Sequence, residues 1–325
     1  MMEIKKVGLI TSGGDAPGMN ACLRFLIKGL IDRGITVYGI KRGYKGLVEK
    51  NYSILTKRDA GGIIQKGGTI LGTARFPEFK NKEILEIAVR NLEELNIDLL
   101  FVIGGEGSMK GAYALHERGV KIIAIPASID NDIYGTDESI GTDTALNAIV
   151  RSIDVIKDTA SAHDRAFIIE VMGHTSGFLA LYSSIAVGAE AVFIPEYDTD
   201  VDEVVRRLNQ RFDEGRTNSI IVVAEGKASG YDIKQLMQEK GVKYELRVTV
   251  LGHLQRGGAP TFRDRKLSFD FATYAMELMG KGIHGVMVAK QKGNITHINL
   301  KDVITNKKHL EKRILKIVET LKWED

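Results

Sequence analysis

The sequence of 325 residues contains one cysteine, five prolines and almost no net charge. The single cysteine, Cys22, cannot form an internal disulfide, which excludes a disulfide-stapled secreted fold and indicates a reducing compartment. The 45 Lys and Arg residues against 42 Asp and Glu residues leave a net charge of +3, too small to indicate binding to nucleic acid. No apolar run approaches the roughly 20 residues of a membrane-spanning helix, and the first residues lack a signal-peptide pattern. We therefore expect a cytoplasmic protein that binds neither nucleic acid nor membrane.

Hydrophobic residues make up 44% of the chain, which is ordinary for a soluble globular protein, and the length suggests about two domains. Short apolar runs without polar alternation predict strands of a parallel sheet covered by helices on both faces. These runs are residues 7–10, 99–103, 121–125, 166–169, 191–194, 219–223 and 286–289. Apolar residues at helical spacing predict helices over residues 19–33, 84–95, 145–158, 201–212 and 271–279. The alternation of strands and helices predicts an α/β fold.

Glycine, proline and acidic residues are concentrated just after the expected strands. Residues 11–18, 104–108 and 126–132 follow the first three strands, and similar loops follow the later ones. In open α/β sheets, ligands bind outside the carboxyl ends of the strands. We therefore expect a binding site at these ends, although no shift in composition marks a domain boundary.

Two of these loops, residues 13–15 and 104–108, are rich in glycine. Glycines let backbone N–H groups approach phosphate oxygens, and the N-terminus of a following helix adds positive potential. Each loop alone is equally well explained as a tight strand-to-helix turn. Neither is a Walker A loop, and neither is a G-x-G-x-x-G followed by an acidic residue, which argues against a nicotinamide-dependent dehydrogenase. Glu106 is a candidate ligand for a phosphate-linked Mg²⁺.

The third loop carries two carboxylates, Asp130 and Asp132, separated by one residue. In an extended backbone, residues two apart point the same way, so both carboxylates would face one spot. One could then take a proton from an attacking hydroxyl while the other holds a metal or orients the base. An acidic turn without function is the alternative interpretation.

Basic residues beside glycines form the last group of candidate residues, and they indicate phosphate binding. They are Arg75, Arg165, Arg247, His253 and Arg256. For each arginine alone, a solvated surface position is the alternative. Two phosphate cradles, a carboxylate pair and a basic set together favour phosphoryl transfer, which needs positioning and charge neutralisation more than a covalent nucleophile. Cys22 lies in a mostly apolar helix and is expected to pack rather than react.

Together these motifs resemble the ATP-dependent 6-phosphofructokinases of the bacterial type. Several long motifs in the right order are far more specific than any single glycine loop. The matching stretches are TSGGDAPGMNA (11–21), GGTILGTARFPEF (67–79), IGGEGS (103–108), SIDNDIYGTDESIGTDTA (128–145), EVMG (170–173) and VLGHLQRGGAPTFRDR (250–265).

The resemblance implies two Rossmann-like three-layer α/β/α domains with largely parallel sheets and the active site in the cleft between them. One domain, residues 1–141 plus about 254–305, would bind the nucleotide. The other, about 142–253 plus 306–325, would bind the sugar phosphate. A homotetramer is also implied, because active sites of the family borrow arginines from a neighbouring subunit.

The implied reaction transfers the γ-phosphoryl group of Mg·ATP to the 1-hydroxyl of fructose 6-phosphate, giving fructose 1,6-bisphosphate and ADP. Asp130 matches the base, Arg75 matches the residue that bridges the transferring group, and Ser128 and Asp132 match their neighbours. Glu106 and Asp132 are the implied Mg²⁺ ligands. The implied ATP contacts are Gly14, Tyr44, Arg75, Phe76, Lys80, Glu106, Gly107 and Ser108. The implied sugar-phosphate contacts are Ser128, Asp130, Asp132, Arg165, Met172, Gly173, His174, Glu225, Arg247, His253 and Arg256, with Arg165 and Arg247 donated across the subunit interface.

Two positions bear on the phosphoryl donor. Pyrophosphate-using relatives carry Asp where this chain has Gly107 and Lys where it has Ala127. A carboxylate at position 107 would crowd and repel the α-phosphate of ATP, whereas glycine leaves room for it. Both positions therefore favour ATP over pyrophosphate.

Three residues depart from the family pattern. Glu106 replaces Asp, so the metal ligand is one methylene longer although Mg²⁺ demands tight geometry. His174 replaces Arg, which exchanges a permanently charged fork for an imidazole. Lys80 replaces another Arg and keeps a point charge. These departures leave open a related phosphotransferase that uses pyrophosphate or another sugar phosphate, or a nucleotide-binding regulatory paralogue.

The family's effector site, which binds ADP or phosphoenolpyruvate between subunits, is partly retained. Arg24 and Arg216 keep their positive charge, and Gly188 and Glu190 match the residues on the metal side. The remaining matched positions carry lysine where the family usually has arginine: Lys28, Lys57 and Lys157. We therefore treat allosteric control by ADP or phosphoenolpyruvate as a hypothesis.

Overall fold

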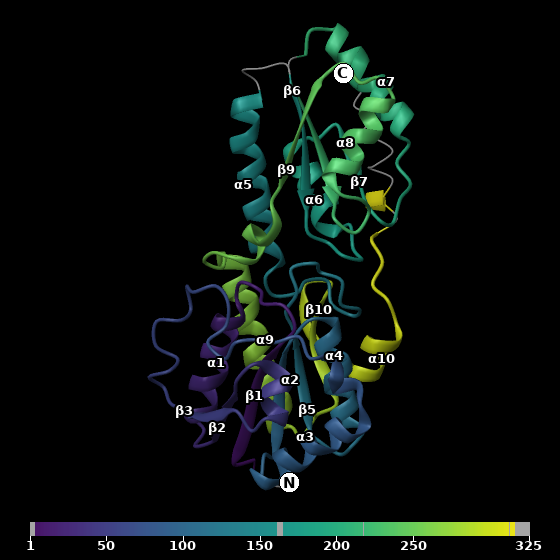
Figure 1. The fold of residues 1–325 in the computed structure, drawn as a ribbon. Helices are drawn as coiled ribbons and strands as arrows, with labels where there is room; N and C mark the ends of the chain where they lie inside the picture. The colour runs from purple at the N-terminus through teal and green to yellow at the C-terminus, as the bar shows by residue number, and fades with distance from the viewer. Residues whose placement is uncertain (1–3, 161–164, 217, 312, 316–325) are drawn as a thin grey trace. The chain divides into compact units, whose positions relative to one another are not determined.

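The computed structural model describes residues 4–160, 165–216, 218–311 and 313–315, which form two compact units (Figure 1). Unit 1 comprises Met1–Thr144 and Arg256–Lys308, and unit 2 comprises Ala145–Gln255 and His309–Asp325. The chain thus leaves unit 1 after Thr144, returns at Arg256 and leaves again after Lys308. Residues 316–325 of the expected sugar-phosphate domain lie outside the described residues.

Unit 1 is built on a seven-stranded sheet with the order β11-β10-β5-β4-β1-β2-β3. Strands β2, β1, β4, β5 and β10 are parallel, and β3 and β11 are the antiparallel edge strands. The bounds are β1 (Lys6–Ser12), β2 (Thr36–Ile40), β3 (Tyr52–Leu55), β4 (Leu99–Gly104), β5 (Ile122–Pro126), β10 (Val286–Gln291) and β11 (Asn294–Asn299). The central strands β4 and β5 are buried along their whole length, as the continuous apolar runs predict.

Helices cover both faces of this sheet. Helices α1 (Met19–Ile31) and α9 (Phe262–Gly280) pack against each other. The other helices share one hydrophobic cluster with the sheet: α2 (Gly43–Val48), α3 (Lys82–Glu94), α4 (Glu106–His116) and α10 (Leu300–Thr305). Two short 3₁₀ turns, η1 (Pro77–Lys80) and η2 (Gly252–Arg256), lie in loops. Cys22 is fully buried in α1, and this burial raises the pKa of its thiol, so it packs as expected.

Unit 2 contains a four-stranded parallel sheet with the order β7-β8-β6-β9. Its strands are β6 (Arg165–Val171), β7 (Ala191–Phe193), β8 (Asn218–Ala224) and β9 (Glu245–Val250). Helices α7 (Val201–Asp213) and α8 (Gly230–Glu239) share a hydrophobic cluster with this sheet, and α6 (Phe178–Val187) packs against β7 and β8. Helix α5 (Thr142–Ala160) begins in unit 1 and continues into unit 2.

The α/β prediction is confirmed, as are the seven predicted strands and the presence of the five predicted helices. The predicted start of the last of these helices at residue 271 is wrong, because α9 begins at Phe262. Four of the seven residues from Phe262 to Ser268 are charged, so apolar periodicity does not reveal these turns, and Thr261 caps them by accepting a hydrogen bond from the Asp264 N–H. Strands β2, β3, β9 and β11 were not predicted. In β3, β9 and β11 the half-exposed residues form no continuous apolar run, and in β2 the residues Thr36 and Gly39 interrupt the buried apolar ones.

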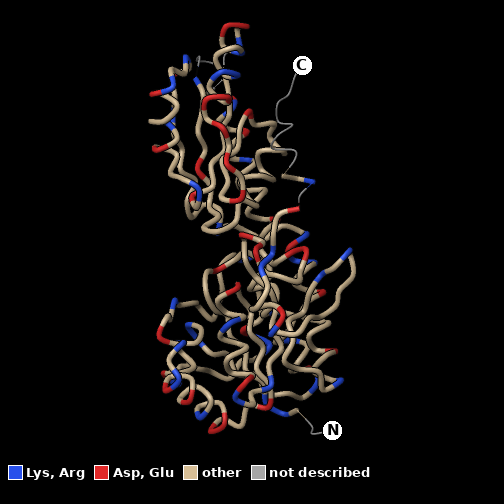
Figure 2. Tube along the Cα trace, turned by 90° about the vertical axis from the view of Figure 1, so that its right-hand side faces the viewer, with Lys and Arg blue, Asp and Glu red and all other residues tan. Residues whose placement is uncertain are grey.

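Charges of both signs are interspersed over both units, in keeping with the small net charge (Figure 2). Within the described part of the chain, none of the helices is both long enough and apolar enough to cross a membrane.

Candidate functional site

Three of the predicted ligand loops lie side by side at one edge of the unit 1 sheet. Strands β1, β4 and β5 are parallel neighbours, and their last residues are in register: Ser12 pairs with Gly104, and Gly104 pairs with Pro126. The loops that follow them therefore leave the sheet at the same edge. This is the arrangement expected of a ligand site in an open α/β sheet.

The first loop lies against a guanidinium group. Gly13 adopts a left-handed backbone with φ 83°, which glycine favours. Arg256, from the second chain segment of unit 1, donates a hydrogen bond of 2.9 Å from Nη1 to the carbonyl oxygen of Asp15. A Cβ added to Gly14 would lie 2.5 Å from that Nη1. The glycine loop is thus next to a permanent positive charge, which suits an anionic ligand.

The second loop opens helix α4. Its first residue is Glu106, and no side chain caps the preceding Gly105. The Ser108 N–H donates to the Gly105 carbonyl oxygen at 2.9 Å, which leaves the N–H groups of Glu106 and Gly107 for an anion. Among the described residues, the buried Ser108 hydroxyl has no hydrogen-bond partner. That hydroxyl lies 3.2 Å from the Cβ position of Gly13, so the first two loops converge. A Cβ added to Gly107 would meet nothing within 4 Å, so the protein itself leaves space there.

Tyr44 supports the second loop from the core. Its side chain is 5% exposed, and its hydroxyl donates a hydrogen bond of 2.6 Å to the carbonyl oxygen of Ser108. The ring stacks on Phe79 at a centroid distance of 4.2 Å. Burial raises the pKa of the Tyr44 hydroxyl, which therefore remains a donor at neutral pH. Tyr44 was expected to contact ATP. In the structure it is buried and supports the backbone of the second loop through its hydroxyl.

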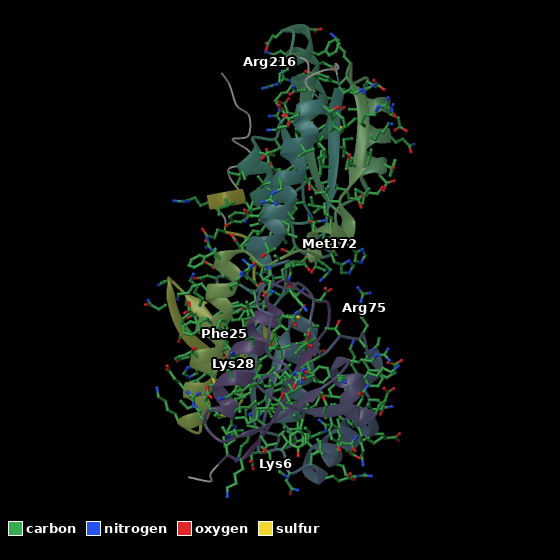
Figure 3. The ribbon with its side chains drawn as sticks, turned by 90° about the vertical axis from the view of Figure 1, so that its left-hand side faces the viewer. Lys6, Phe25, Lys28, Arg75, Met172 and Arg216 are labelled. Atoms are coloured by element: carbon green, nitrogen blue, oxygen red, sulfur yellow. The ribbon has the colours of Figure 1, made fainter. Side chains whose placement is uncertain are left out.

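The remaining expected ATP contacts lie on a segment that is tied to strand β1. The Thr11 hydroxyl contacts the Thr69 hydroxyl at 2.9 Å and donates to the Gly72 carbonyl oxygen at 3.0 Å. The segment then continues to Arg75, which is exposed and labelled in Figure 3. Phe76 is half-buried and Lys80 is exposed. Arg75 and Lys80, two exposed basic residues, are therefore carried by a segment whose first part is hydrogen-bonded to the carboxyl end of β1.

The third loop is not extended, so the premise by which Asp130 and Asp132 were expected to point the same way is wrong. Asn131, between them, has φ 49° and so adopts the left-handed conformation. Ser128 joins the two acidic residues. Its hydroxyl donates to Asp132 Oδ1 at 3.2 Å and accepts a hydrogen bond of 3.3 Å from the Asp130 N–H. A turn, rather than a strand, therefore gathers Ser128, Asp130 and Asp132.

Asn131 holds this turn in shape, although the sequence motifs did not single it out. Its side chain donates to the Asp137 carbonyl oxygen at 3.0 Å and accepts from the Ser139 N–H at 3.0 Å. The Ser139 hydroxyl in turn donates to the Ser128 carbonyl oxygen at 2.6 Å. Asparagine adopts the left-handed conformation more readily than most residues, and this preference was the available signal.

Asp132 and Glu106 are the two carboxylates that could share a cation. Burial raises the pKa of Asp132, the Glu106 carboxylate raises it further, and the Ser128 hydrogen bond opposes this. Glu106 also forms an ion pair of 2.6 Å with Lys110. No group of three or more His, Cys, Asp or Glu suited to a metal occurs among the described residues. Two carboxylates completed by substrate phosphates are nevertheless a common way of binding Mg²⁺.

Unit 2 gathers a second set of expected residues at the carboxyl ends of β8, β6 and β9, which are neighbours in its sheet. Met172, Gly173 and His174 follow β6, Glu225 follows β8 and His253 follows β9. The Glu225 N–H donates a hydrogen bond of 2.9 Å to the carbonyl oxygen of Val171, the last residue of β6. This main-chain hydrogen bond joins the loop after β8 to the end of β6.

Gln255 connects the loop after β9 to the loop after β6, and the sequence motifs did not single it out. Its side chain is fully buried, accepts a hydrogen bond of 3.1 Å from the Met172 N–H and donates one of 3.0 Å to the Gly252 carbonyl oxygen. A Cβ added to Gly226 would lie 2.0 Å from the His174 carbonyl oxygen. The backbone beneath His174 is therefore closely packed, while its side chain is exposed.

Arg165 and Arg247, the pair expected to serve a neighbouring subunit, lie on the adjacent strands β6 and β9. Arg165 Nε lies 2.8 Å from Glu245 Oε2, and Arg247 forms an ion pair with the same carboxylate. Glu245 therefore holds the two guanidinium groups beside each other, a role that the sequence motifs did not reveal.

The residues matched to an effector site form one group in each unit. In unit 1, Lys57 pairs with Asp32, and Lys28, labelled in Figure 3, lies within electrostatic reach of the same carboxylate. Arg24, also on α1, donates to the Ala60 carbonyl oxygen.

In unit 2, Lys157 donates to the Val187 carbonyl oxygen, next to Gly188, which ends α6 with φ 60°. Glu190 accepts a hydrogen bond of 2.6 Å from the Ile220 N–H and lies 3.5 Å from Arg211. Arg216 is exposed beyond the end of α7 and is labelled in Figure 3. Burial raises the pKa of Glu190, while the Ile220 hydrogen bond and Arg211 oppose that effect.

Comparisons with known proteins agree with one another. A family model described as Phosphofructokinase matches residues 6–279. The chain is 44% identical over 319 residues to the ATP-dependent 6-phosphofructokinase of Thermotoga neapolitana, covering 98% of this chain and 100% of that protein. It is 49% identical over 282 residues to the ATP-dependent 6-phosphofructokinase of Lysinibacillus sphaericus, covering 87% of this chain and 88% of that protein.

Solved structures give the same result for the fold. Pichia pastoris phosphofructokinase in the T-state matches with a TM-score of 0.88 and 32% identity, over 99% of this chain and 37% of that much longer chain. A pyrophosphate-dependent phosphofructokinase from Marinobacter aquaeolei matches with a TM-score of 0.83 over 98% of this chain and 91% of that chain. At 20% identity, this second match bears on the fold alone.

Proposed function

The chain belongs to the phosphofructokinase family, and we propose that it transfers the γ-phosphoryl group of ATP to the 1-hydroxyl of fructose 6-phosphate. The products are fructose 1,6-bisphosphate and ADP, so the chain is a glycolytic kinase. The observation that carries the proposal is the register of Ser12, Gly104 and Pro126, which brings two glycine loops and the acidic loop to one edge of the sheet. Such chemistry depends on positioning and on charge neutralisation, and this edge supplies groups for both.

We propose that the two glycine loops bind the phosphates of ATP. The uncapped N-terminus of α4 offers N–H donors and the positive end of a helix dipole. Arg256, beside Gly14, and the exposed Arg75 would neutralise charge on the transferring group. The open space at Gly107 leaves room for the α-phosphate and supports ATP over pyrophosphate as the donor.

Asp130 is the proposed general base, which takes the proton of the sugar 1-hydroxyl as its oxygen attacks the γ-phosphorus. The hydroxyl oxygen forms the new O–P bond, the bond from the γ-phosphorus to the bridging oxygen breaks, and ADP leaves. Ser128 and Asp132 position Asp130 through the hydrogen bonds of the turn. A base in this position typically contributes about 10²–10⁴-fold to the rate.

We propose that Glu106 and Asp132 hold Mg²⁺. The two carboxylates lie close enough for the charge of Glu106 to raise the pKa of Asp132. Mg²⁺ is usually bound by one or two carboxylates together with substrate phosphates rather than by a full set of protein ligands. When bound with ATP, the ion would neutralise phosphate charge. Glu106 is paired with Lys110 and would have to exchange that partner.

We propose that the carboxyl edge of the unit 2 sheet binds the sugar phosphate, through Met172, Gly173, His174, Glu225 and His253. The loops there are held by Gln255 and by main-chain hydrogen bonds. Arg165 and Arg247, paired with Glu245, are proposed to serve a neighbouring subunit of a homotetramer. The basic residues on α1 and the group around Glu190 are the proposed ADP or phosphoenolpyruvate site.

The test is an initial-rate assay with fructose 6-phosphate and Mg²⁺, in which ATP and pyrophosphate are supplied separately. We expect fructose 1,6-bisphosphate with ATP and no comparable rate with pyrophosphate. A rate with pyrophosphate alone would overturn the choice of donor. No product with either donor, from folded protein, would overturn the proposed reaction.

A further inference from the structure

Lys308 reaches the loop that carries the two acidic residues, although it lies far from them in the sequence. It is the last residue of unit 1 and follows helix α10. Its ammonium group donates a hydrogen bond of 3.2 Å to the main-chain carbonyl oxygen of Asp137. That carbonyl oxygen also accepts the hydrogen bond of 3.0 Å from the Asn131 side chain. Lys308 and Asn131 therefore share one acceptor.

This shared acceptor is held firmly in place. The Asp137 N–H donates to the Lys290 carbonyl oxygen at 2.7 Å, and an Asp137 carboxylate oxygen accepts from the Lys292 N–H at 2.6 Å. Both partners lie at the end of β10 and in the turn that follows it. The carbonyl oxygen of Asp137 is thus a fixed point, and the groups that bond to it are located relative to the sheet.

The hydrogen bond from Lys308 to the Asp137 carbonyl oxygen matters for the acidic loop because Asn131 bonds to the same oxygen. Its left-handed backbone forms the bend between Asp130 and Asp132, and this conformation is strained for a residue with a side chain. Hydrogen bonds from its side chain to Asp137 and Ser139 compensate for that strain. A carbonyl oxygen has two lone pairs, so Lys308 and Asn131 can both bond to it, and Lys308 helps to hold in place the acceptor on which the Asn131 side chain depends.

The charge of Lys308 is suited to this place. Burial lowers its pKa to about 8, and the carboxylates of Asp137, Asp132 and Glu138 act in the opposite direction. A cation within reach of three carboxylates offsets their mutual repulsion and so favours the closely folded loop. Lys307, its neighbour, is exposed and provides a matched control.

We propose that Lys308 is a positioning residue for phosphoryl transfer, which acts through the Asp137 carbonyl and Asn131 to hold Asp130 and Asp132 in place. The inference rests on the proposed function, since it concerns the step in which Asp130 is the base. The proposed role requires no contact between Lys308 and either substrate. Its effect should therefore fall on turnover rather than on the affinity for ATP.

The test compares full-length Lys308→Met, Lys308→Arg and Lys307→Met with the wild type, using Mg·ATP and fructose 6-phosphate. We expect Lys308→Met to lower kcat about tenfold or more, because a hydrogen bond from a charged donor is lost beside the loop. KM for ATP should stay within about twofold, Lys308→Arg should recover most of the turnover, and Lys307→Met should match the wild type. Wild-type kcat in Lys308→Met, or no recovery in Lys308→Arg, would overturn the inference.

A double-mutant cycle keeps the test decisive even if Lys308→Met folds poorly. Asn131→Gly retains the left-handed bend but removes the side chain that shares the acceptor. We expect Lys308→Gln to lose less turnover in the Asn131→Gly background than in the wild type, because Lys308 and Asn131 act through one carbonyl group. Additive losses would overturn the inference. An inactive wild type would instead refute the proposed function, so the two failures are distinguishable.

Discussion

The guanidinium of Arg256 donates a hydrogen bond of 2.9 Å to the carbonyl oxygen of Asp15, which lies 241 residues earlier in the chain. This contact places a permanent positive charge against the glycine loop after β1. The resemblance to phosphofructokinases assigned Arg256 to the sugar phosphate and Gly14 to the nucleotide. Because Arg256 lies beside Gly14, its guanidinium is suited to neutralise the negative charge of the phosphoryl group as that group passes between the two substrates.

Gly14→Ala tests this relationship. The new Cβ would lie 2.5 Å from Arg256 Nη1, so the flexible end of the arginine has to move while the fold remains intact. We expect kcat/KM to fall about tenfold or more, as for loss of a charge-assisted hydrogen bond, with little change in the midpoint of thermal unfolding. Gly280→Ala, whose Cβ meets nothing within 4 Å, is the control. Equal kinetics in both variants would contradict the assigned role of Arg256.

Gly107→Asp tests the choice of donor. Nothing lies within 4 Å of a Cβ at this position, so the substitution should not disturb folding. A carboxylate there would repel the α-phosphate, and we expect KM for ATP to rise about tenfold or more. Gly107→Ala separates bulk from charge and should change KM much less. If the two variants bind ATP equally well, the nucleotide does not pass position 107.

His174→Arg tests the departure from the family pattern in unit 2. The main chain at His174 is packed against Gly226, so the exchange alters only an exposed side chain. A permanent, forked cation should bind the phosphate of the sugar more strongly, lowering KM for fructose 6-phosphate about tenfold while leaving KM for ATP unchanged. A rise in KM for the sugar phosphate would mean that His174 is adapted to a different acceptor.

Asp264 tests how the start of α5 is stabilised. Its buried carboxylate accepts hydrogen bonds of 2.8 Å from the N–H groups of Gly141 and Thr144 and of 2.5 Å from the Thr144 hydroxyl. Burial raises the pKa of Asp264 from 3.8 to about 6. Between these two values the folded state binds more protons than the unfolded state, so this group's contribution to stability is full below pH 3.8 and is lost as the pH rises past 6.

Urea unfolding of the wild type and Asp264→Asn at several pH values measures this effect. The free energy of unfolding of the wild type, minus that of the variant, should fall by about 3 kcal/mol between about pH 3 and about pH 7. The variant also loses hydrogen bonds, which adds an offset that does not depend on pH. A difference that is flat with pH, or that rises, would contradict the raised pKa.

Much of the site could be predicted from the sequence because parallel strands end at one edge of a sheet. Continuous apolar runs identified β1, β4 and β5, and the loops after them carry the glycines and the acidic pair. The resemblance then gave each motif a role. Local sequence also placed the lone Cys22 in a buried helix.

The residues that fix the geometry could not be predicted in this way. Asn131 bends the acidic loop, and its hydrogen bonds depend on Asp137 and Ser139. Gln255 and Glu245 hold loops and arginines through contacts between different strands. These contacts depend on how distant segments meet, which neither periodicity nor a short motif contains.

The central claim is that Asp130 is the base at an edge where ATP phosphates also bind. Measurement of kcat for Asp130→Asn, with the dissociation constant for ATP determined on the same protein, tests it most directly. We expect kcat to fall about 10²–10⁴-fold while ATP binding stays within about twofold, because the substitution removes the proton acceptor but preserves the shape of the side chain. Turnover close to that of the wild type would contradict the claim.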